Sequence, residues 1–454
     1  MDTPPGNIGS DSGNPLSFIA KKLLRKGMKV EANEIKATLL SFMFIFILMA
    51  AYYILRPVRD ALASNWTDAE VSLLWTLNFF ISAAVVALYG AAVSVIRFRV
   101  LVPAIYGFFA LTFICFYIAI TTVSDHTLVN KTFYVWVSVF SLFHVSVFWS
   151  YMADTFNKEQ AERLFAVIAA GASAGALLGP SVPTRLAPVI GAEGLMLVAS
   201  VMLVIPIPII LYLARLKRTE LRNEDVHADL NAVRIGGNPV AGFRQFATNP
   251  YLLAIGVFIL LYTMIGSFVY FEQKNLLAVY DMQTRTQILG GIDWSTNILT
   301  FGLAFFATGR LVTRFGMATA LPLIPVMMIA GLLVLALAPV LAVLIVLQVG
   351  RRAGNYAVTR PAREMLFTGV NREARFKAKP VIDIVVYRGG DTVTAWLFTG
   401  LTQGLGLGLA AVALVGCAIA GLWAAAGVYL GRWFDHHHAT NGPTVLTDPH
   451  ATSE

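Results

Sequence analysis

Three charged residues lie three and four positions apart inside the first long apolar stretch of the chain, LLSFMFIFILMAAYYILRPVRDAL: Arg56, Arg59 and Asp60. On a helix this spacing places them on one face. A charged side chain near the centre of a bilayer costs roughly 2.5 to 3.5 kcal/mol, so such residues usually face the protein interior or a watery path. We expect this face to bind an anion or to gate a pathway. The alternative is that the arginines reach the membrane surface or pair with Asp60 in packing.

Two related charged sets occur in the second half of the chain. Glu272 and Lys274 lie in the seventh apolar stretch, and Asp383, Arg388 and Asp391 lie in the eleventh. If the first helix of each half lines a central cavity, basic groups on the two helices approach a substrate from opposite sides. Guanidinium and ammonium groups both suit phosphate or carboxylate oxygens.

The residues that we expect to hold the anion are Arg56, Arg59, Lys274 and Arg388, and those expected to gate or couple transport are Asp60, Glu272, Asp383, Asp391 and His144. Some of these residues have a structural alternative. His144 suits a proton carrier because histidine titrates near neutral pH, but the sequence favours the alternative of a hydrogen-bonded packing residue. Arg388 and Asp391 stand three apart, so they form either a structural ion pair or a gate. Lys377 and Lys379 either capture substrate at the entrance or anchor the topology.

The composition identifies the class of protein. Of 454 residues, 57% are hydrophobic and only 13% are charged, against about 25% charged in soluble domains. At roughly 20 residues per span, the length allows about a dozen helices. The expected spans are residues 38–62, 71–96, 100–123, 132–153, 164–188, 193–215, 252–279, 293–312, 317–338, 340–360, 380–403 and 407–431.

These stretches lack sustained alternation of apolar and polar residues, which favours helices over a barrel. The predicted fold is therefore an all-α polytopic membrane protein of twelve transmembrane helices in two six-helix halves. The expected parts are an N-terminal tail (1–33), a first half (34–216), a central loop (217–248), a second half (249–434) and a C-terminal tail (435–454). The tail before the first span has no cleavable apolar core, so we expect no signal peptide.

Basic residues cluster in alternate loops. They occur before the first span, in the central loop and after the last span, whereas most intervening loops are nearly free of Lys and Arg. By the positive-inside rule both termini are cytoplasmic. We expect a multi-pass protein of a bacterial inner membrane, present as a monomer.

Several other classes of function are excluded. The net charge of +8 is explained by these loops, so no nucleic-acid partner is expected. Cys115 and Cys417 lie within spans at a spacing that fits no metal motif, and we expect no cofactor. Neither a phosphate-binding glycine loop nor a hydrolase elbow is present, so an enzyme is not expected.

Two local patterns resemble known transporters. GRLVTRFG, from Gly309 to Gly316, resembles the Gly-x-Leu-x-Asp-Arg-x-Gly loop of the major facilitator superfamily, with Thr313 in place of the aspartate. NKEQA at 157–161 resembles NREAR at 371–375, as expected if the two halves share one fold. Together with twelve spans and a central loop, these patterns resemble the major facilitator fold.

YYILRPVRDAL and KAKPVIDIVVYRGGDTVTAW are similar to segments of the ATP/ADP translocases of plastids and intracellular bacteria. The matching residues are Leu55, Arg56, Asp60, Lys379, Ile382, Asp383 and Val385. The resemblance implies that Arg59 stands where the family has a transport-critical lysine, and that Glu272 and Lys274 match its acidic and basic pair. Asp391 departs from the pattern because it stands where the family has a lysine, and Arg388 lies one turn earlier.

The leading hypothesis is a secondary transporter that moves an organic anion, such as a nucleotide or another phosphorylated or carboxylated metabolite, by alternating access and by exchange. One alternative is a proton-driven exporter of an amphipathic compound such as a siderophore or drug. A third hypothesis, from another class, is a membrane scaffold that has lost transport.

Overall fold

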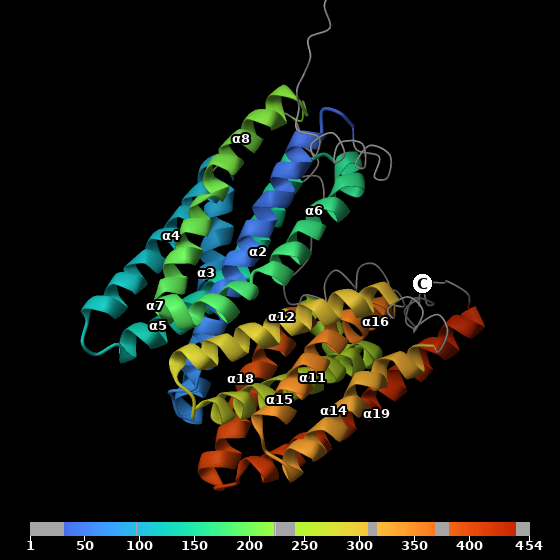
Figure 1. The fold of residues 1–454 in the computed structure, drawn as a ribbon. Helices are drawn as coiled ribbons and strands as arrows, with labels where there is room; N and C mark the ends of the chain where they lie inside the picture. The colour runs from blue at the N-terminus through green and yellow to red at the C-terminus, as the bar shows by residue number, and fades with distance from the viewer. Residues whose placement is uncertain are drawn as a thin grey trace, which may run out of the picture.

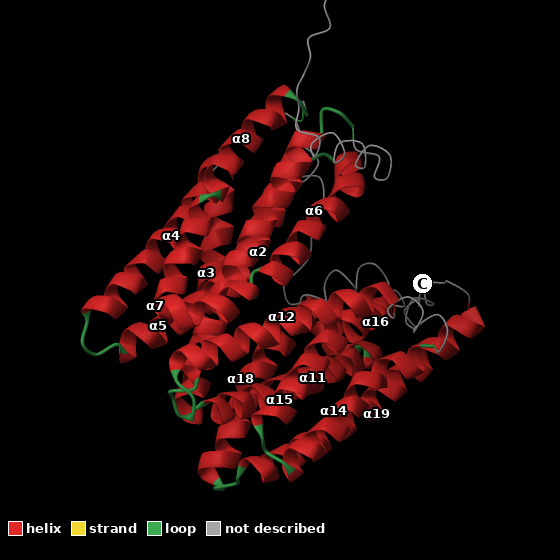
Figure 2. Cartoon of the chain, viewed as in Figure 1, coloured by secondary structure: helices red, strands yellow, loops and turns green. Residues whose placement is uncertain are grey.

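The computed structural model describes residues 31–96, 98–221, 223, 241–306, 316–367 and 381–441. Every regular element within these ranges is a helix (Figure 2). Helices satisfy all their backbone polar groups within one segment, which a bilayer requires. The all-α prediction is therefore confirmed. The expected central loop, both tails, the GRLVTRFG turn up to residue 315, and Lys377 and Lys379 lie largely or wholly outside the described residues.

The first half of the chain forms one bundle, drawn blue to green in Figure 1. Its helices are α2 (Ile35–Ala63), α3 (Asp68–Val95), α4 (Phe98–Thr122), α5 (Thr127–Thr155), α6 (Lys158–Leu178), α7 (Ser181–Val204) and α8 (Pro206–Thr219). Gly191, with a φ of 74°, breaks α7 in two, a conformation that glycine adopts at low cost. The first part of α7 thus completes the fifth span with α6, and the second part forms the sixth with α8.

The second half forms the other bundle, drawn yellow to red. It comprises α10 (Ala241–Thr248), α11 (Pro250–Leu277), α12 (Met282–Phe306), α14 (Met317–Leu337), α15 (Leu341–Gly354), η1 (Asn355–Thr359), α16 (Arg360–Leu366), η3 (Val381–Val386), α18 (Tyr387–Thr399), η4 (Gly400–Gly404) and α19 (Leu409–Asn441). The π-helical segments η1, η3 and η4 interrupt the tenth and eleventh spans. Such turns are frequent at functional sites.

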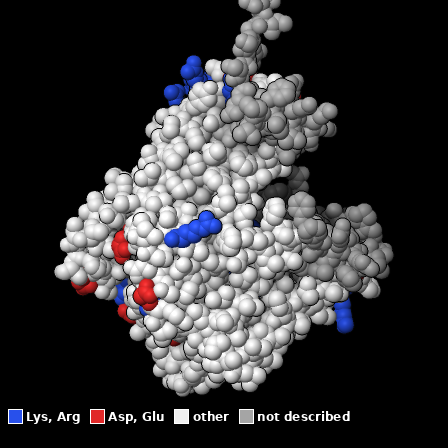
Figure 3. Space-filling view, in the orientation of Figure 1, with Lys and Arg blue, Asp and Glu red and all other residues white. Residues whose placement is uncertain are grey.

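Joined at these breaks, the described helices correspond in sequence to the twelve expected spans. Eight stretches are long and apolar enough on their own to cross a membrane, and the remaining passes are shorter, broken or more polar. Figure 3 shows one face of the molecule that is largely uncharged, with basic side chains near the α8 end, one basic side chain in mid-face and a few acidic side chains at the lower left. A multi-pass membrane protein has this surface because charged residues are costly in lipid.

A run of glycines lets α6 pack directly against α2. A Cβ atom added at Gly171 or Gly175 would collide with the carbonyl oxygen of Phe42 or Phe46, and one at Gly179 would lie 2.8 Å from the Cα atom of Ala50. Small residues four apart allow this close approach of two backbones in membranes. The seam fixes α2, which carries Arg56 and Arg59, within its own half.

The two halves are joined by polar contacts at one end, which we call the closed end: the α2–α3 turn, the α11–α12 turn and η4. Lys274 Nζ lies 2.7 Å from both Asp68 Oδ1 and the carbonyl oxygen of Trp66. Thr402 Oγ1 donates to Asp68 Oδ2 at 2.8 Å, and Arg285 donates to Asn65 Oδ1 at 2.5 Å.

Candidate functional site: a cavity lined by arginine and tyrosine

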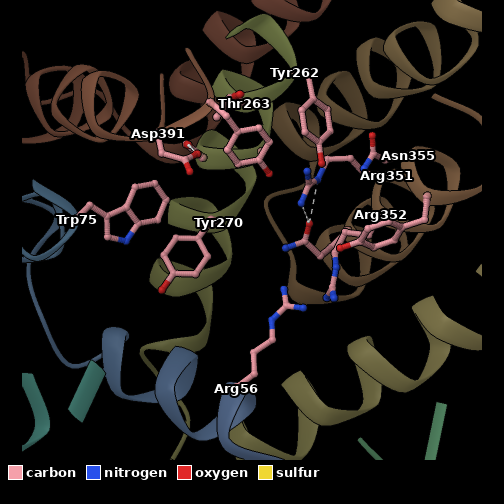
Figure 4. A pocket seen from close by; sticks show the side chains of 14 residues that line it. Arg56, Trp75, Tyr262, Thr263, Tyr270, Arg351, Arg352, Asn355 and Asp391 are labelled. Carbon is pink, nitrogen blue, oxygen red and sulfur yellow. Dashed lines mark hydrogen bonds between the residues drawn. The ribbon is translucent and has the colours of Figure 1, made fainter. Parts of the chain in front are cut away.

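A cavity lies between the halves, lined by residues of α2, α3 and α5 from the first and of α11, α15, η1 and α18 from the second. It has two adjoining compartments with volumes of about 170 and 320 Å³. Figure 4 shows the first compartment. Residues that line both compartments are Arg56, Trp75, Tyr270, Tyr356, Tyr387 and Asp391. The larger compartment has the volume of a small site for a small molecule.

The three charged residues of α2 form an ion-pair network. Arg59 Nη2 lies 2.7 Å from Asp60 Oδ1, and Arg56 Nε lies 3.7 Å from Asp60 Oδ2. Arg56 Nη1 also lies 3.6 Å from Asp293 Oδ1 on α12, and Arg352 on α15 donates to the same oxygen. The network therefore crosses from one half to the other.

Arg351 is held differently from its neighbour Arg352. Its Nε and Nη2 atoms donate to Gln348 Oε1 at 3.1 and 2.8 Å. Gln348 Nε2 in turn donates to Gln273 Oε1 at 2.8 Å. A relay of two neutral amides thus positions this guanidinium group at the cavity wall, as Figure 4 shows for Arg351.

On α18, Arg388 lines the larger compartment and Asp391 lines both. Ser267 Oγ donates to Asp391 Oδ1 at 3.3 Å. Within the described residues no ion pair joins Arg388 to Asp391, so the pairing considered for them is not formed in this conformation. Asp383 falls in η3, and its side chain lies outside the described part of the structure.

The structure places three of the expected site residues away from the cavity lining. Lys274 is 4% exposed and is engaged with Asp68 at the closed end. Glu272 is 1% exposed, and neither of its carboxylate oxygens has a hydrogen-bond partner among the described residues. His144 is also buried.

His144 lies in a ring stack. Its Nδ1 atom is 3.1 Å from the carbonyl oxygen of Phe140. Its ring lies against Tyr52 and Phe140, with centroid distances of 4.7 and 5.2 Å. These contacts fit the packing alternative stated above.

Tyrosine side chains supply the second kind of polar group in the cavity lining. Tyr134 and Tyr270, from opposite halves, have hydroxyl oxygens 2.8 Å apart, and Trp75 Nε1 donates to Tyr134 at 2.7 Å. The Arg59 guanidinium carbon lies 5.7 Å from the Tyr134 ring centroid, a cation–π distance. Tyr52, Tyr262 and Tyr270 also line the cavity, whereas Tyr53 does not.

Several cavity residues were given no role by the sequence: Asp293, Gln348, Arg351, Arg352, Tyr356 and Tyr387. Asp293 stands in GGIDWSTN, a polar interruption of an apolar stretch, which is the signal that marks an intramembrane functional residue. Arg351 and Arg352 were visible as charges but had no predicted partner. The contacts that define them come from distant parts of the chain.

Comparison with known proteins agrees with this fold. The structure of a bacterial homologue of the human lysosomal transporter Spinster, inward-facing and unoccupied, matches with 14% identity over 90% of this chain and 98% of that chain, at a TM-score of 0.58. The nucleoside transporter NupG matches with 13% identity over 88% of this chain and 99% of that one, at a TM-score of 0.60.

A relative by sequence is "ADP,ATP carrier protein 1" of Chlamydia pneumoniae, 22% identical over 181 residues. The match spans only 35% of that protein and 35% of this chain. The family model described as Major Facilitator Superfamily matches residues 37–358, which is well over half of the chain. With twelve helical passes in two bundles and a cavity between them, the chain belongs to the major facilitator superfamily.

Proposed function

We propose that this protein is a secondary transporter that carries an organic anion through the central cavity by alternating access. The observation that supports this proposal is the cavity lining, where guanidinium groups from α2, α15 and α18 face a common space with tyrosine hydroxyl groups. Arginine offers planar pairs of donors to phosphate or carboxylate oxygens. The proposed anion ligands are Arg56, Arg59, Arg351 and Arg388, and Lys274 is assigned to the gate instead.

In the proposed cycle, the contacts of the closed end break when the transporter changes state. As the halves rock apart, Lys274 would separate from Asp68 and Arg285 from Asn65, and the opposite end would close. With both termini on the cytoplasmic side, the present conformation opens inward. We also propose the domain boundaries given above, a monomer, and a bacterial inner membrane.

A nucleotide is the first substrate to test. Support comes from the local match to an ADP,ATP carrier protein and from the residues around Arg56 and Asp60 that resemble the translocases. Exchange of one anion for another needs no proton carrier, because the second anion occupies the cavity while the transporter returns to its first conformation. Another phosphorylated metabolite fits the same guanidinium groups.

The experiment is uptake of labelled ATP into liposomes that hold the purified protein, with and without internal ADP. The matched variants are Arg56→Gln, in both cavity compartments, and Arg218→Gln, at an exposed position on α8. We expect uptake that depends on internal ADP in the wild type and in Arg218→Gln. Arg56→Gln should reduce it by about tenfold or more, the loss expected for one charge-assisted contact.

Uptake that is independent of internal nucleotide would contradict the proposed exchange mechanism. Transport of neutral adenosine, with no uptake of ATP, ADP or AMP, would remove the proposal that the substrate is anionic.

A further inference from the structure

The charges around the cavity do not balance. Among the described residues, the lining of the two compartments and of a smaller space beside them contains five arginines and three aspartates, and no lysine or glutamate. The arginines are Arg56, Arg59, Arg351, Arg352 and Arg388; the aspartates are Asp60, Asp293 and Asp391. Five guanidinium groups against three carboxylates leave two positive charges without a counter-charge.

The surplus can be located. Asp60 is engaged by Arg59 and Asp293 by Arg352, each at hydrogen-bond distance, and Arg56 lies between these two pairs. No described carboxylate lies within ion-pair distance of Arg351 or Arg388. Arg56, Arg59 and Arg352 thus share two carboxylates, which leaves one surplus positive charge in this network. Arg351 on α15 and Arg388 on α18 share the cavity lining with Asp391 alone, which leaves the other surplus charge in the second half of the chain.

Arg351 is not a partly hydrated surface group. The residue is 8% exposed, and the amide oxygen of Gln348 accepts two of its hydrogen bonds without neutralising its charge. Its Nη1 atom, near Gly266 in the cavity wall, donates no hydrogen bond to the described residues. A buried cation without a counter-charge is costly, so this guanidinium is arranged for an anion that the chain itself does not supply.

Asp391 limits the negative charge that an anion can bring into the cavity. Its carboxylate lines both compartments and, within the described part of the chain, accepts a side-chain hydrogen bond from Ser267 alone. It offsets one cation at the cavity wall and repels anionic groups placed beside it. The surplus of two positive charges already includes this carboxylate.

We propose that the cavity binds a doubly charged anionic group of the substrate, with Arg351 as its primary ligand and Arg388, the other arginine without a carboxylate at ion-pair distance, as the second. A phosphate monoester has this charge near neutral pH, as does a dicarboxylate. A singly charged group would leave one surplus positive charge in the cavity, whereas AMP, ADP and ATP each end in a phosphate that can carry two negative charges. The inference rests on the proposed anion transport and specifies the charge of the group that the arginines bind.

The test uses sulfate, a small dianion that needs no particular organic scaffold. Thermal unfolding of the purified protein is measured against sodium sulfate, with sodium chloride at equal ionic strength as the reference. Sulfate also stabilises proteins non-specifically, so each variant is compared with the exposed-site control Arg218→Gln. We expect a saturable rise in Tm for the wild type and the control. In Arg351→Gln and Arg388→Gln, the sulfate concentration at half-saturation should rise about tenfold or more.

A second measurement needs no ligand. In chloride alone, Arg351→Gln should unfold at or above the wild-type temperature, because the substitution removes an uncompensated buried charge. Arg352→Gln should unfold at a lower temperature, because Asp293 loses its ion pair with Arg352 and keeps only the more distant Arg56. A strong loss of Tm in Arg351→Gln would show that its charge is already compensated, and would overturn the proposal.

Other outcomes separate this inference from the proposed function. A sulfate effect that is absent, does not saturate or is equal in all variants overturns the dianion site, even where organic anions are transported. If the site binds sulfate but no organic anion is transported, the dianion site stands and the proposed transport function fails.

Discussion

Lys274→Met should open the closed end of the transporter. Lys274 Nζ donates to Asp68 and to the Trp66 carbonyl oxygen, both at 2.7 Å, and it is 4% exposed while Asp68 is 6% exposed. Removing one partner of a buried ion pair costs about 3–5 kcal/mol. Since this pair joins the two halves, that cost applies to the present conformation and not to one in which the closed end is open. The equilibrium should therefore shift toward the open form by about a hundredfold or more.

The assay is labelling of a cysteine introduced at Leu289, which lines the small space below the closed end, in a background with Cys115→Ser and Cys417→Ser. We expect a membrane-impermeant maleimide to label Lys274→Met faster than the parent protein. The double variant Asp68→Asn/Lys274→Met leaves no unpaired charge and should return toward the parent rate. Equal labelling of the parent and Lys274→Met, in protein that elutes as a folded monodisperse species, would refute the assignment of this pair to a gate.

Three further predictions follow from the packing and the network. Asp293→Asn should lower the free energy of unfolding by about 3 kcal/mol, because it leaves Arg352 without its carboxylate and Arg56 with Asp60 alone. The double variant Asp293→Asn/Arg352→Gln should recover part of this loss, as measured by thermal unfolding in detergent, and additive losses would show that the two residues do not interact. Gly175→Leu should prevent close packing of α2 on α6 and abolish the folded protein peak in size-exclusion chromatography. The control Gly421→Ala, where an added Cβ meets nothing within 4 Å, should change the free energy of unfolding by less than about 0.5 kcal/mol. Normal folding of Gly175→Leu would contradict the close packing of α6 on α2. Tyr134→Phe removes the hydroxyl shared by Trp75 and Tyr270 and should weaken substrate affinity by about 1 kcal/mol in a binding assay, with Tyr117→Phe as an off-cavity control; unchanged affinity would show that this hydroxyl does not shape the site.

The fold was accessible from the sequence because one physical constraint dominates it. Long apolar stretches must be helical in lipid, so hydropathy alone predicts the number of passes. The breaks at Gly191 and at η1 and η3 were not predicted, since they depend on packing and on local turn geometry. Some predicted spans consequently correspond to two joined helices.

The site was accessible only in part. Arg56, Arg59 and Arg388 were singled out by their charge and do line the cavity. Lys274 was singled out for the same reason, but the rotation of α11 directs it to Asp68. Hydropathy does not encode this rotation. The partners Asp293 and Gln348 were not assigned either, because their contacts with Arg352 and Arg351 are set by how α12 and α15 pack.

The measurement that most directly tests the central account compares adenosine, AMP and ATP as labelled substrates in the same proteoliposomes, with Arg351→Gln beside the wild type. The account predicts uptake of phosphorylated compounds, no uptake of adenosine, and an about tenfold or greater loss of uptake in the variant. Equal transport of adenosine by both proteins, without uptake of either nucleotide, would contradict the assignment of the arginine-lined cavity to anions.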